Sequence, residues 1–225
     1  MIDNSKQNAL IIFARYPVLG EVKTRLASSF GKDFALDFYK QCSRHLFAVV
    51  VQNQNDIFSP FLFGSEKHEL NKMKNWAGSG FEYHYQEGSD LGEKMSNAFK
   101  KVFTLGAKKA VIIGTDVPDM SIHLIAHSFQ LLDEKDFVLG PSHDGGYYLL
   151  GMKNLNFNPF PGIKWSTETV LSQTISRITE NDFSFTKLEQ LHDIDDEHSL
   201  NLWMNMNKKD YDNPVFKFVK KNFSF

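Results

Sequence analysis

The sequence has few of the features that mark secreted, membrane-spanning or nucleic-acid-binding proteins. Its only cysteine, Cys42, excludes an intramolecular disulfide; this fits a reducing compartment, although a secreted protein without disulfides would look the same. The formal net charge is -2, so no overall basic field argues for a nucleic acid polymer as partner. No apolar run approaches the roughly 20 residues that cross a bilayer. The first ten residues also lack the basic start and apolar region of a signal peptide. We therefore expect a cytoplasmic protein without a membrane span, in which any phosphate site is local.

What is present is an ordinary globular composition. The chain has 225 residues, 42% of them hydrophobic, and 21 are phenylalanine, so we expect a substantial aromatic-rich core. This length suits one large domain or two small ones. Because no repeat, linker or low-complexity tract is evident, we expect a single domain over residues 1–225.

Apolar runs that suit buried strands alternate with helical stripes through most of the chain. The runs lie at 9–14, 61–64, 81–86, 110–114, 137–140, 147–152 and 183–188. Helical patterns lie at 34–50, 68–76, 91–102, from Ser121 to 132, from Ser166 or Thr167 to 180, and at 195–206. This alternation predicts an α/β fold, a three-layer α/β/α sandwich with a mostly parallel sheet. The final NPVFKFVKKNFSF is compatible with an end helix, an edge strand or a partner contact.

Three polar segments directly follow predicted strands. They are ARYPVLGEVKTR, GTDVPD and GPSHDGGYY. In an open parallel sheet, ligands bind beyond the carboxyl ends of the strands. We therefore expect these segments to meet along one rim of the sheet.

The first segment has the chemistry of a phosphate site. Gly20 permits close backbone approach, Lys23 supplies a compact charge, and Arg15 and Arg25 can fork onto phosphate oxygens. It is not a Walker P-loop, because Val22 stands where that motif has glycine. A solvated basic turn is the alternative.

The second segment offers a metal ligand. Asp116 lies just past a buried strand, and Mg²⁺ takes one or two carboxylates together with water and phosphate oxygens. Thr115 could contact a nucleoside, and we expect Asp119 to cap the next helix. The alternative makes Asp116 an ordinary turn residue.

The third segment and a late acidic run complete the candidate site. Gly145 and Gly146 allow a tight backbone, beside which Asp144 directs a carboxylate. A plain glycine turn is the alternative. In HDIDDEHSL, Asp195 is the candidate second metal ligand, although acids also favour a helix start without any metal. His123 and His127 have the spacing of zinc helices but lack the glutamate of HExxH and a third ligand, so we do not expect zinc.

Taken together, FARYPVLGEVKTRLA, GTDVPDM, HDGGYYLLGM and GIKWST resemble the bacterial DUF2064 proteins, also called rSAM/selenodomain-associated transferase 1. That family belongs to the nucleotide-diphospho-sugar transferase superfamily with the GT-A fold. It is similar more distantly to 2-phospho-lactate and molybdenum-cofactor guanylyltransferases. One departure is DIDDEHSL, which stands where the family commonly has D-I-D-T-P-E-D-L; Asp193 and Asp195 remain.

The resemblance implies a role for each segment. A nucleotide would bind over Arg15, Gly20, Lys23 and Arg25, and a divalent metal at Asp116. The sugar or acceptor would lie near Asp144, Gly145 and Gly146. The QEGSDLGEKM segment matches a family pattern, and Gln86, Asp90 and Gly92 would line the nucleotide pocket.

We therefore predict a Mg²⁺- or Mn²⁺-dependent transferase that acts on a nucleotide or sugar nucleotide and a small-molecule acceptor. Lys23 and Asp116 would stabilise charge, and Asp144 is the candidate base. Nucleotidyl transfer is the first expectation. Glycosyl transfer from a nucleotide-diphospho-sugar is the second, and a nucleotide sensor without turnover is the third.

Overall fold

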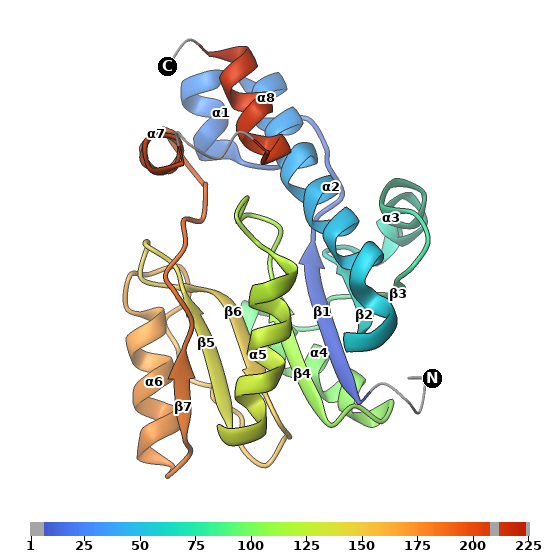
Figure 1. Cartoon of the computed structure of the whole chain (residues 1–225), viewed down its shortest axis with the longest axis vertical. Helices are drawn as coiled ribbons and strands as arrows, with labels where there is room; N and C mark the ends of the chain where they lie inside the picture. Colours follow the sequence, from blue (N-terminus) through green and yellow to red (C-terminus); the bar gives the residue numbers. More distant parts are fainter. Residues whose placement is uncertain (1–6, 208–211, 224–225) are drawn as a thin grey trace.

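A seven-stranded sheet runs through the centre of the molecule. The computed structural model describes residues 7–207 and 212–223. The strands are β1 (Asn8–Ala14), β2 (Ser59–Gly64), β3 (Glu82–Tyr85), β4 (Lys109–Ile113), β5 (Phe137–Pro141), β6 (Tyr147–Met152) and β7 (Phe185–Lys187). Their order is β3-β2-β1-β4-β6-β5-β7 (Figure 1). Only β6 is antiparallel to its neighbours, which confirms the mostly parallel sheet.

The central strands are buried on both faces. In β1, Leu10 and Ile12 point into one core cluster, while Ala9 and Ile11 point into another. This alternation follows from the two-residue period of a strand. The unbroken apolar run in the sequence therefore reflects two buried faces.

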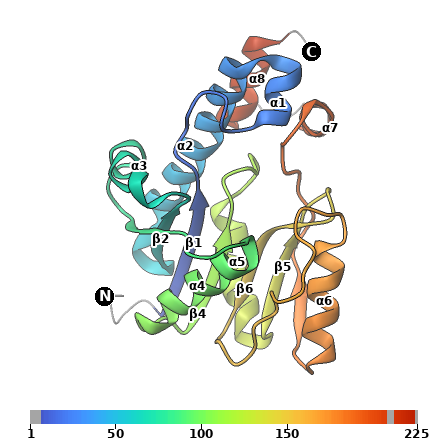
Figure 2. The same cartoon turned by 180° about the vertical axis from the view of Figure 1, so that it is seen from behind.

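Helices cover both faces. They are α1 (Thr24–Phe30), α2 (Lys32–Ile57), α3 (Leu70–Ala77), α4 (Leu91–Thr104), α5 (Ile122–Glu134), α6 (Val170–Glu180), α7 (Glu197–Met206) and α8 (Pro214–Asn222), with a short 3₁₀ turn η1 (Lys67–Glu69). Side chains of α2, α3 and α5 pack on one face, and those of α4 and α6 on the other (Figure 2). This confirms the α/β sandwich. The single domain over 1–225 stays a prediction.

A third core cluster stands beyond the carboxyl ends of β1 and β4. It joins α1, the start of α2, α7 and α8, and we call these elements the helical cap (Figure 1). The apolar residues along α2 belong to two hydrophobic clusters. Phe38 and Cys42 pack in the helical cap, whereas Leu46 and Val50 pack against the sheet. Of the alternatives for the final segment, the structure shows a helix, α8, which belongs to the helical cap, and not an edge strand; a partner contact is not tested, and residues 224 and 225 lie outside the described residues.

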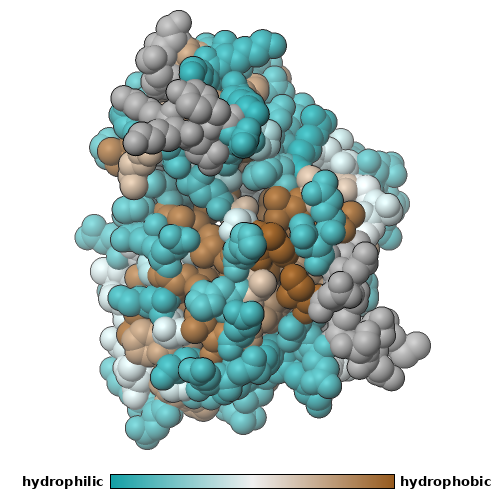
Figure 3. All heavy atoms as spheres, in the orientation of Figure 1, coloured by the Kyte–Doolittle hydropathy of each residue, from teal (hydrophilic) through white to brown (hydrophobic). Residues whose placement is uncertain are grey.

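Hydrophilic side chains cover most of the face shown in Figure 3, and hydrophobic ones gather in its middle. Among residues 7–207 and 212–223, no helix has the length and apolar character needed to cross a membrane.

Three expected local details are wrong. Asp119 does not cap α5; the Ser121 hydroxyl does, accepting from the Leu124 N–H. Helix α6 begins at Val170, with Thr169 as its N-cap residue, rather than after Ser166 or Thr167. Helix α7 begins at Glu197, since Asp196 rather than Asp195 forms its capping box.

Candidate functional site

A cavity of about 460 Å³ opens at the carboxyl ends of β1 and β4, below the helical cap. Its volume lies in the range of small-molecule sites, roughly 300–1,000 Å³. The lining combines an apolar part and a charged part. The apolar part contains Phe13, Leu91 and Met95, and the charged part contains Arg15, Glu21, Lys23, Asp116, Asp193 and Asp195.

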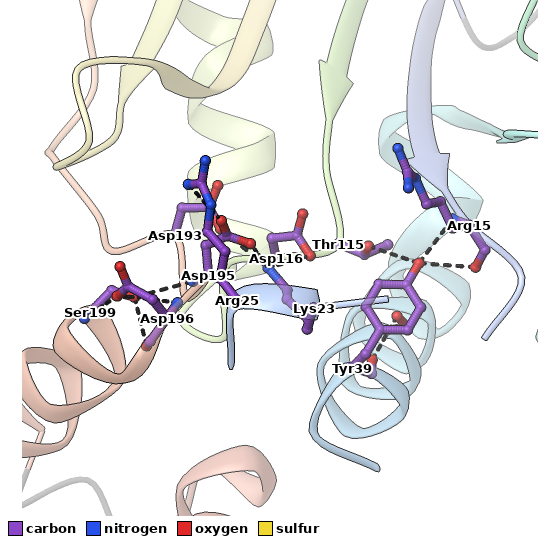
Figure 4. Close-up of polar contacts among 11 residues, drawn as sticks. Arg15, Lys23, Arg25, Tyr39, Thr115, Asp116, Asp193, Asp195, Asp196 and Ser199 are labelled. Carbon is purple, nitrogen blue, oxygen red and sulfur yellow. Dashed lines mark hydrogen bonds and ion pairs between the residues drawn. The ribbon is translucent and has the colours of Figure 1, made fainter. Parts of the chain in front are cut away.

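Lys23 is the centre of the charged part. Its side chain is only 4% exposed, and its Nζ lies 2.9 Å from Asp116 Oδ1, 3.6 Å from Asp193 Oδ1 and 3.9 Å from Asp195 Oδ1 (Figure 4). We call these three acids the carboxylate triad. Three segments distant in sequence thus bring one ammonium group and three carboxylates together.

Local structure explains how Lys23 reaches this position. Its backbone is left-handed, with φ 49° and ψ 48°, directly before α1. Such a conformation costs a residue other than glycine about 1 kcal/mol or more and is typical of functional sites. Gly20, with φ 80°, turns the chain ahead of it. The buried Val22, which excluded a P-loop, anchors this turn in the protein.

The carboxylates are positioned by the strand end and by the start of α7. Asp116 follows β4, and its carbonyl oxygen accepts from the Ile194 N–H at 3.1 Å, which fixes the segment containing Asp193 and Asp195 against it. Asp196 then caps α7 through Ser199. The acidic run therefore contains both a helix cap and two members of the triad.

The charged side chains in this cluster shift one another's pKa. Burial alone would lower the pKa of Lys23, but Asp116, Asp193 and Asp195 more than offset it, so the pKa lies above its usual value. For Asp193, burial raises the pKa to about 7, against the opposing pull of Lys23. Its Oδ1 is buried and has no hydrogen-bond partner among the described residues. Such an oxygen marks a place where a cation would be stabilised.

The two arginines of the first segment lie differently. Arg25, whose side chain is 74% exposed, donates from Nη1 to Asp195 Oδ2 at 3.1 Å. Arg15 lines the cavity with its guanidinium directed away from the triad (Figure 4). Arg25 is not among the cavity-lining residues, so of the two arginines Arg15 alone lines the cavity.

Tyr39 of α2 is a site residue that sequence reasoning missed. Its buried hydroxyl donates to the Arg15 carbonyl and accepts from the Arg15 N–H, both at 2.9 Å, and also accepts from the Thr115 hydroxyl at 3.3 Å. Burial and the charge of Asp116 raise the pKa of Tyr39, so it remains protonated. It joins the ends of β1 and β4. The only sequence signal was its place beside Phe38 on the apolar stripe.

The diglycine segment lies at the same rim because it connects β5 to the antiparallel β6. Asp144 Oδ1 accepts from the Ser142 hydroxyl at 2.5 Å and from the Gly146 N–H at 2.9 Å. A Cβ at Gly145, whose φ is 87°, would overlap the backbone of Glu168. Asp144 and the two glycines are not among the cavity-lining residues, although the charge of Asp144 helps to raise the pKa of Asp193.

Of the QEGSDLGEKM segment, Gln86 lines the cavity, and its Nε2 donates to the Phe63 carbonyl at 3.1 Å. Asp90 instead caps α4 through the Glu93 N–H. Gly92 allows close packing, since a Cβ there would lie 2.8 Å from the Trp165 ring. Neither Asp90 nor Gly92 is among the cavity-lining residues.

The triad offers only carboxylate oxygens, which are the ligands that Mg²⁺ and Mn²⁺ prefer. As placed, no group of three or more histidine, cysteine or acidic side chains within residues 7–207 and 212–223 could hold a metal ion. The Lys23 ammonium lies among the triad oxygens. The donor chemistry and the unpartnered Asp193 Oδ1 therefore fit a divalent cation, provided that Lys23 moves.

Comparisons with known proteins agree with this fold. A family described as "Uncharacterized protein conserved in bacteria (DUF2064)" matches residues 49–167. No curated protein matches the chain. A solved structure titled as a "putative nucleotide-diphospho-sugar transferase", from Desulfovibrio desulfuricans G20, is 27% identical with a TM-score of 0.88; the match covers 96% of this chain and 95% of that one.

Two more distant structures share the fold alone. A 4-diphosphocytidyl-2C-methyl-D-erythritol synthase from Anaerococcus prevotii DSM 20548 has a TM-score of 0.59 at 12% identity, and the match covers 92% of this chain and 98% of that one. A CMP:2-keto-3-deoxy-manno-octonic acid synthetase, solved with CTP, has a TM-score of 0.56 at 10% identity, with 91% and 100% covered. The predicted fold and family are thus confirmed.

Proposed function

Since the chain belongs to the DUF2064 family, whose match covers more than half of it, we propose that it is a metal-dependent nucleotidyltransferase. It takes a nucleoside triphosphate, transfers the nucleoside monophosphate to a phosphorylated or hydroxyl acceptor, and releases pyrophosphate. The observation that carries this proposal is the buried Lys23 facing Asp116 in the cavity at the ends of β1 and β4.

The related structures support the nucleotide half of the proposal. The relative from Desulfovibrio is named for nucleotide-diphospho-sugars, and the two more distant structures are named for cytidylyl products, one of them with bound CTP. The cavity has both an apolar part suited to a base and a charged part that would suit phosphates once its carboxylates hold a metal.

The residues would divide the work as follows. Lys23, Arg15 and Arg25 neutralise charge on the triphosphate, while Asp116 and Asp195 hold Mg²⁺ or Mn²⁺, which adds positive charge at the phosphates. The acceptor oxygen attacks the α-phosphorus, and the bond from that phosphorus to the pyrophosphate oxygen breaks. A hydroxyl acceptor must also lose a proton, for which Asp144 at the rim is the proposed base. A phosphate acceptor needs no base.

Glycosyl transfer is the second candidate, because the relative at 27% identity is named for nucleotide-diphospho-sugars. In that reaction the acceptor attacks the sugar carbon and a nucleoside diphosphate leaves. Two observations favour nucleotidyl transfer: the several cations beside the cavity, which suit the higher charge of a triphosphate, and the single aspartate of GTDVP in place of a D-x-D. A sensor without turnover is the third candidate. The cytoplasmic location stays a prediction.

The test measures pyrophosphate and nucleoside diphosphate release in parallel. Nucleoside triphosphates and sugar nucleotides are first screened by thermal shift with and without Mg²⁺ or Mn²⁺, since a bound ligand raises the melting temperature. Any binder is then incubated with phosphorylated and hydroxylated small acceptors. Pyrophosphate release from a triphosphate supports the proposal, whereas diphosphate release from a sugar nucleotide supports the second candidate.

Asp116→Asn tests the assigned metal role. It should abolish metal-dependent nucleotide binding and turnover, whereas Asp37→Asn removes the same charge from an exposed position on α2 and should change neither. Binding without turnover for every acceptor would favour the sensor. If no nucleotide or sugar nucleotide shifted the melting temperature, the whole proposal would be wrong.

A further inference from the structure

The charged part of the cavity is assigned two roles that one arrangement of its side chains cannot fulfil together. Lys23 is to hold phosphate, and Asp116 and Asp195 are to hold a metal. In the structure the Lys23 ammonium instead lies within 4.0 Å of all three triad carboxylates. With a side chain 4% exposed, it has no room to face bulk solvent as well.

We propose that the Lys23 ammonium is the resident cation of the metal site, so that a divalent metal and Lys23 compete for the same carboxylate oxygens. Metal binding moves Lys23 off the triad, and the freed ammonium turns to the phosphates of the nucleotide. This inference deepens the proposed function and rests on it for the phosphate step alone.

The geometry carries the competition. Nζ lies 2.9, 3.6 and 3.9 Å from one oxygen of Asp116, Asp193 and Asp195, so a metal shared by these oxygens would have to take the space that the ammonium now fills. Asp193 Oδ1, buried and without a hydrogen bond, is 3.6 Å from Nζ, which leaves its ligand capacity largely unused. Lys23 therefore uses only part of the ligand capacity of the triad oxygens, and a cation that binds oxygen ligands more strongly can replace Lys23.

The charge balance indicates when the replacement occurs. Around the cavity four acids, Glu21 and the triad, face three cations, Arg15, Lys23 and Arg25, so the acids are incompletely neutralised and a bare triphosphate would be repelled. A metal that replaces Lys23 brings two charges to the triad and frees one for the phosphates. Metal and nucleotide should therefore promote each other's binding, a reciprocal coupling.

Titration with Mn²⁺ alone tests the competition without any substrate. Free Mn²⁺ is followed by electron paramagnetic resonance with the wild type, Lys23→Met and Lys32→Met at low ionic strength. Lys23→Met keeps a chain of similar length without the charge. Lys32→Met removes the same charge at the start of α2, close to Gly20 and outside the triad.

Lys23→Met should bind Mn²⁺ at least about fivefold more tightly than the wild type, because a unit positive charge within 4 Å of the ligands is gone, whereas Lys32→Met should match the wild type. A gain below fivefold, or a loss of affinity, overturns the inference. Circular dichroism first checks that each variant is folded.

A second measurement uses the wild type and so needs no variant to fold. Lys23 should resist acetylation by a water-soluble acylating reagent while it lies in the triad, and mass spectrometry of the digested protein reads its modification. Saturating Mg²⁺ should raise its reactivity at least about threefold, since the ammonium leaves a buried ion pair, relative to NaCl at the same ionic strength. Unchanged protection at Mg²⁺ concentrations shown to saturate the site overturns the inference.

These outcomes separate the inference from the proposed function. If pyrophosphate is released but Lys23→Met binds Mn²⁺ no more tightly, the inference fails and the function stands. If the variant binds Mn²⁺ more tightly but no nucleotide turns over, the competition stands and the function fails.

Discussion

The hydroxyl of Tyr39 provides the sharpest test of how the site is positioned. It forms two hydrogen bonds to the Arg15 backbone, both 2.9 Å long, and a third from Thr115 at 3.3 Å. Tyr39→Phe removes only this oxygen and leaves an N–H and a C=O at the end of β1 without partners. Each unpaired backbone group costs about 1–3 kcal/mol when buried. Because the Arg15 groups are only partly buried, we expect a total loss of about 2–4 kcal/mol in the free energy of unfolding.

Urea unfolding followed by fluorescence or circular dichroism measures this loss. Tyr16→Phe is the matched control, because Tyr16 packs on Trp76 in the same aromatic cluster as Tyr39. Within the described part of the chain its hydroxyl makes no hydrogen bond, so the control should change stability by less than about 0.5 kcal/mol. Equal losses for the two variants, or a loss below about 1 kcal/mol for Tyr39→Phe, would refute the assignment of Tyr39 as the link between β1 and β4.

Three further predictions concern neighbouring parts of the site. Burial raises the pKa of Asp193 from 3.8 to about 7, so the folded state binds this proton more tightly and the wild type loses stability as the pH rises from about 4 through 7. In metal-free buffer, Asp193→Asn should therefore be more stable than the wild type at pH 8, by about 1–2 kcal/mol once partial exposure is allowed for, and should match it at pH 4; urea unfolding that gave the same difference between the two proteins at both pH values would contradict this. Gly145→Ala should cost more than about 2 kcal/mol, since its Cβ overlaps the facing loop, whereas Gly162→Ala, at a similar φ of 79° and with no atom closer to its Cβ than 3.9 Å, should cost only about 1 kcal/mol; equal shifts in melting temperature would argue against the overlap. Trp203→Phe removes the bond from Nε1 to Asp119, 2.7 Å long, and should lose about 1.5–3 kcal/mol, which urea unfolding would disprove by showing no change.

The order and type of the elements follow from the sequence because local signals agree with the fold. Strands such as β1 are buried on both faces, and α2 carries one continuous apolar stripe. The antiparallel β6 had no such signal. A strand buried on both faces has the same apolar run in either direction, so direction is decided by the connection that precedes it. Here that connection is the short Gly145-Gly146 turn from β5.

The residues that meet at the carboxyl ends of the strands could also be predicted from the sequence, but the ion pair between them could not. Lys23 and Asp116 follow strands whose ends meet at the same edge, as the sequence indicated. Their ion pair depends on the left-handed backbone at Lys23, and sequence gives little signal for that conformation in a lysine. The hydrogen-bond partner of Asp119 could not be predicted from the sequence either. It has the composition of a helix cap, yet a tryptophan 84 positions later donates to it.

The helical cap is therefore part of the site rather than a cover for it. Lys23 and Arg25 lie at the start of α1, and Asp193 and Asp195 lie just before α7, so packing within the cap sets the distances among them. Hydrogen bonds hold the cap against the segment that follows β4, among them the bond from Trp203 to Asp119, the bond from Asn213 to the Pro118 carbonyl and the bond from the Ile194 N–H to the Asp116 carbonyl. The left-handed Lys23 and the raised pKa of Asp193 are both unfavourable to the folded state and both lie in this cavity. The separate hydrophobic core of the cap therefore supports, at one place, an unfavourable backbone conformation and a close group of charges.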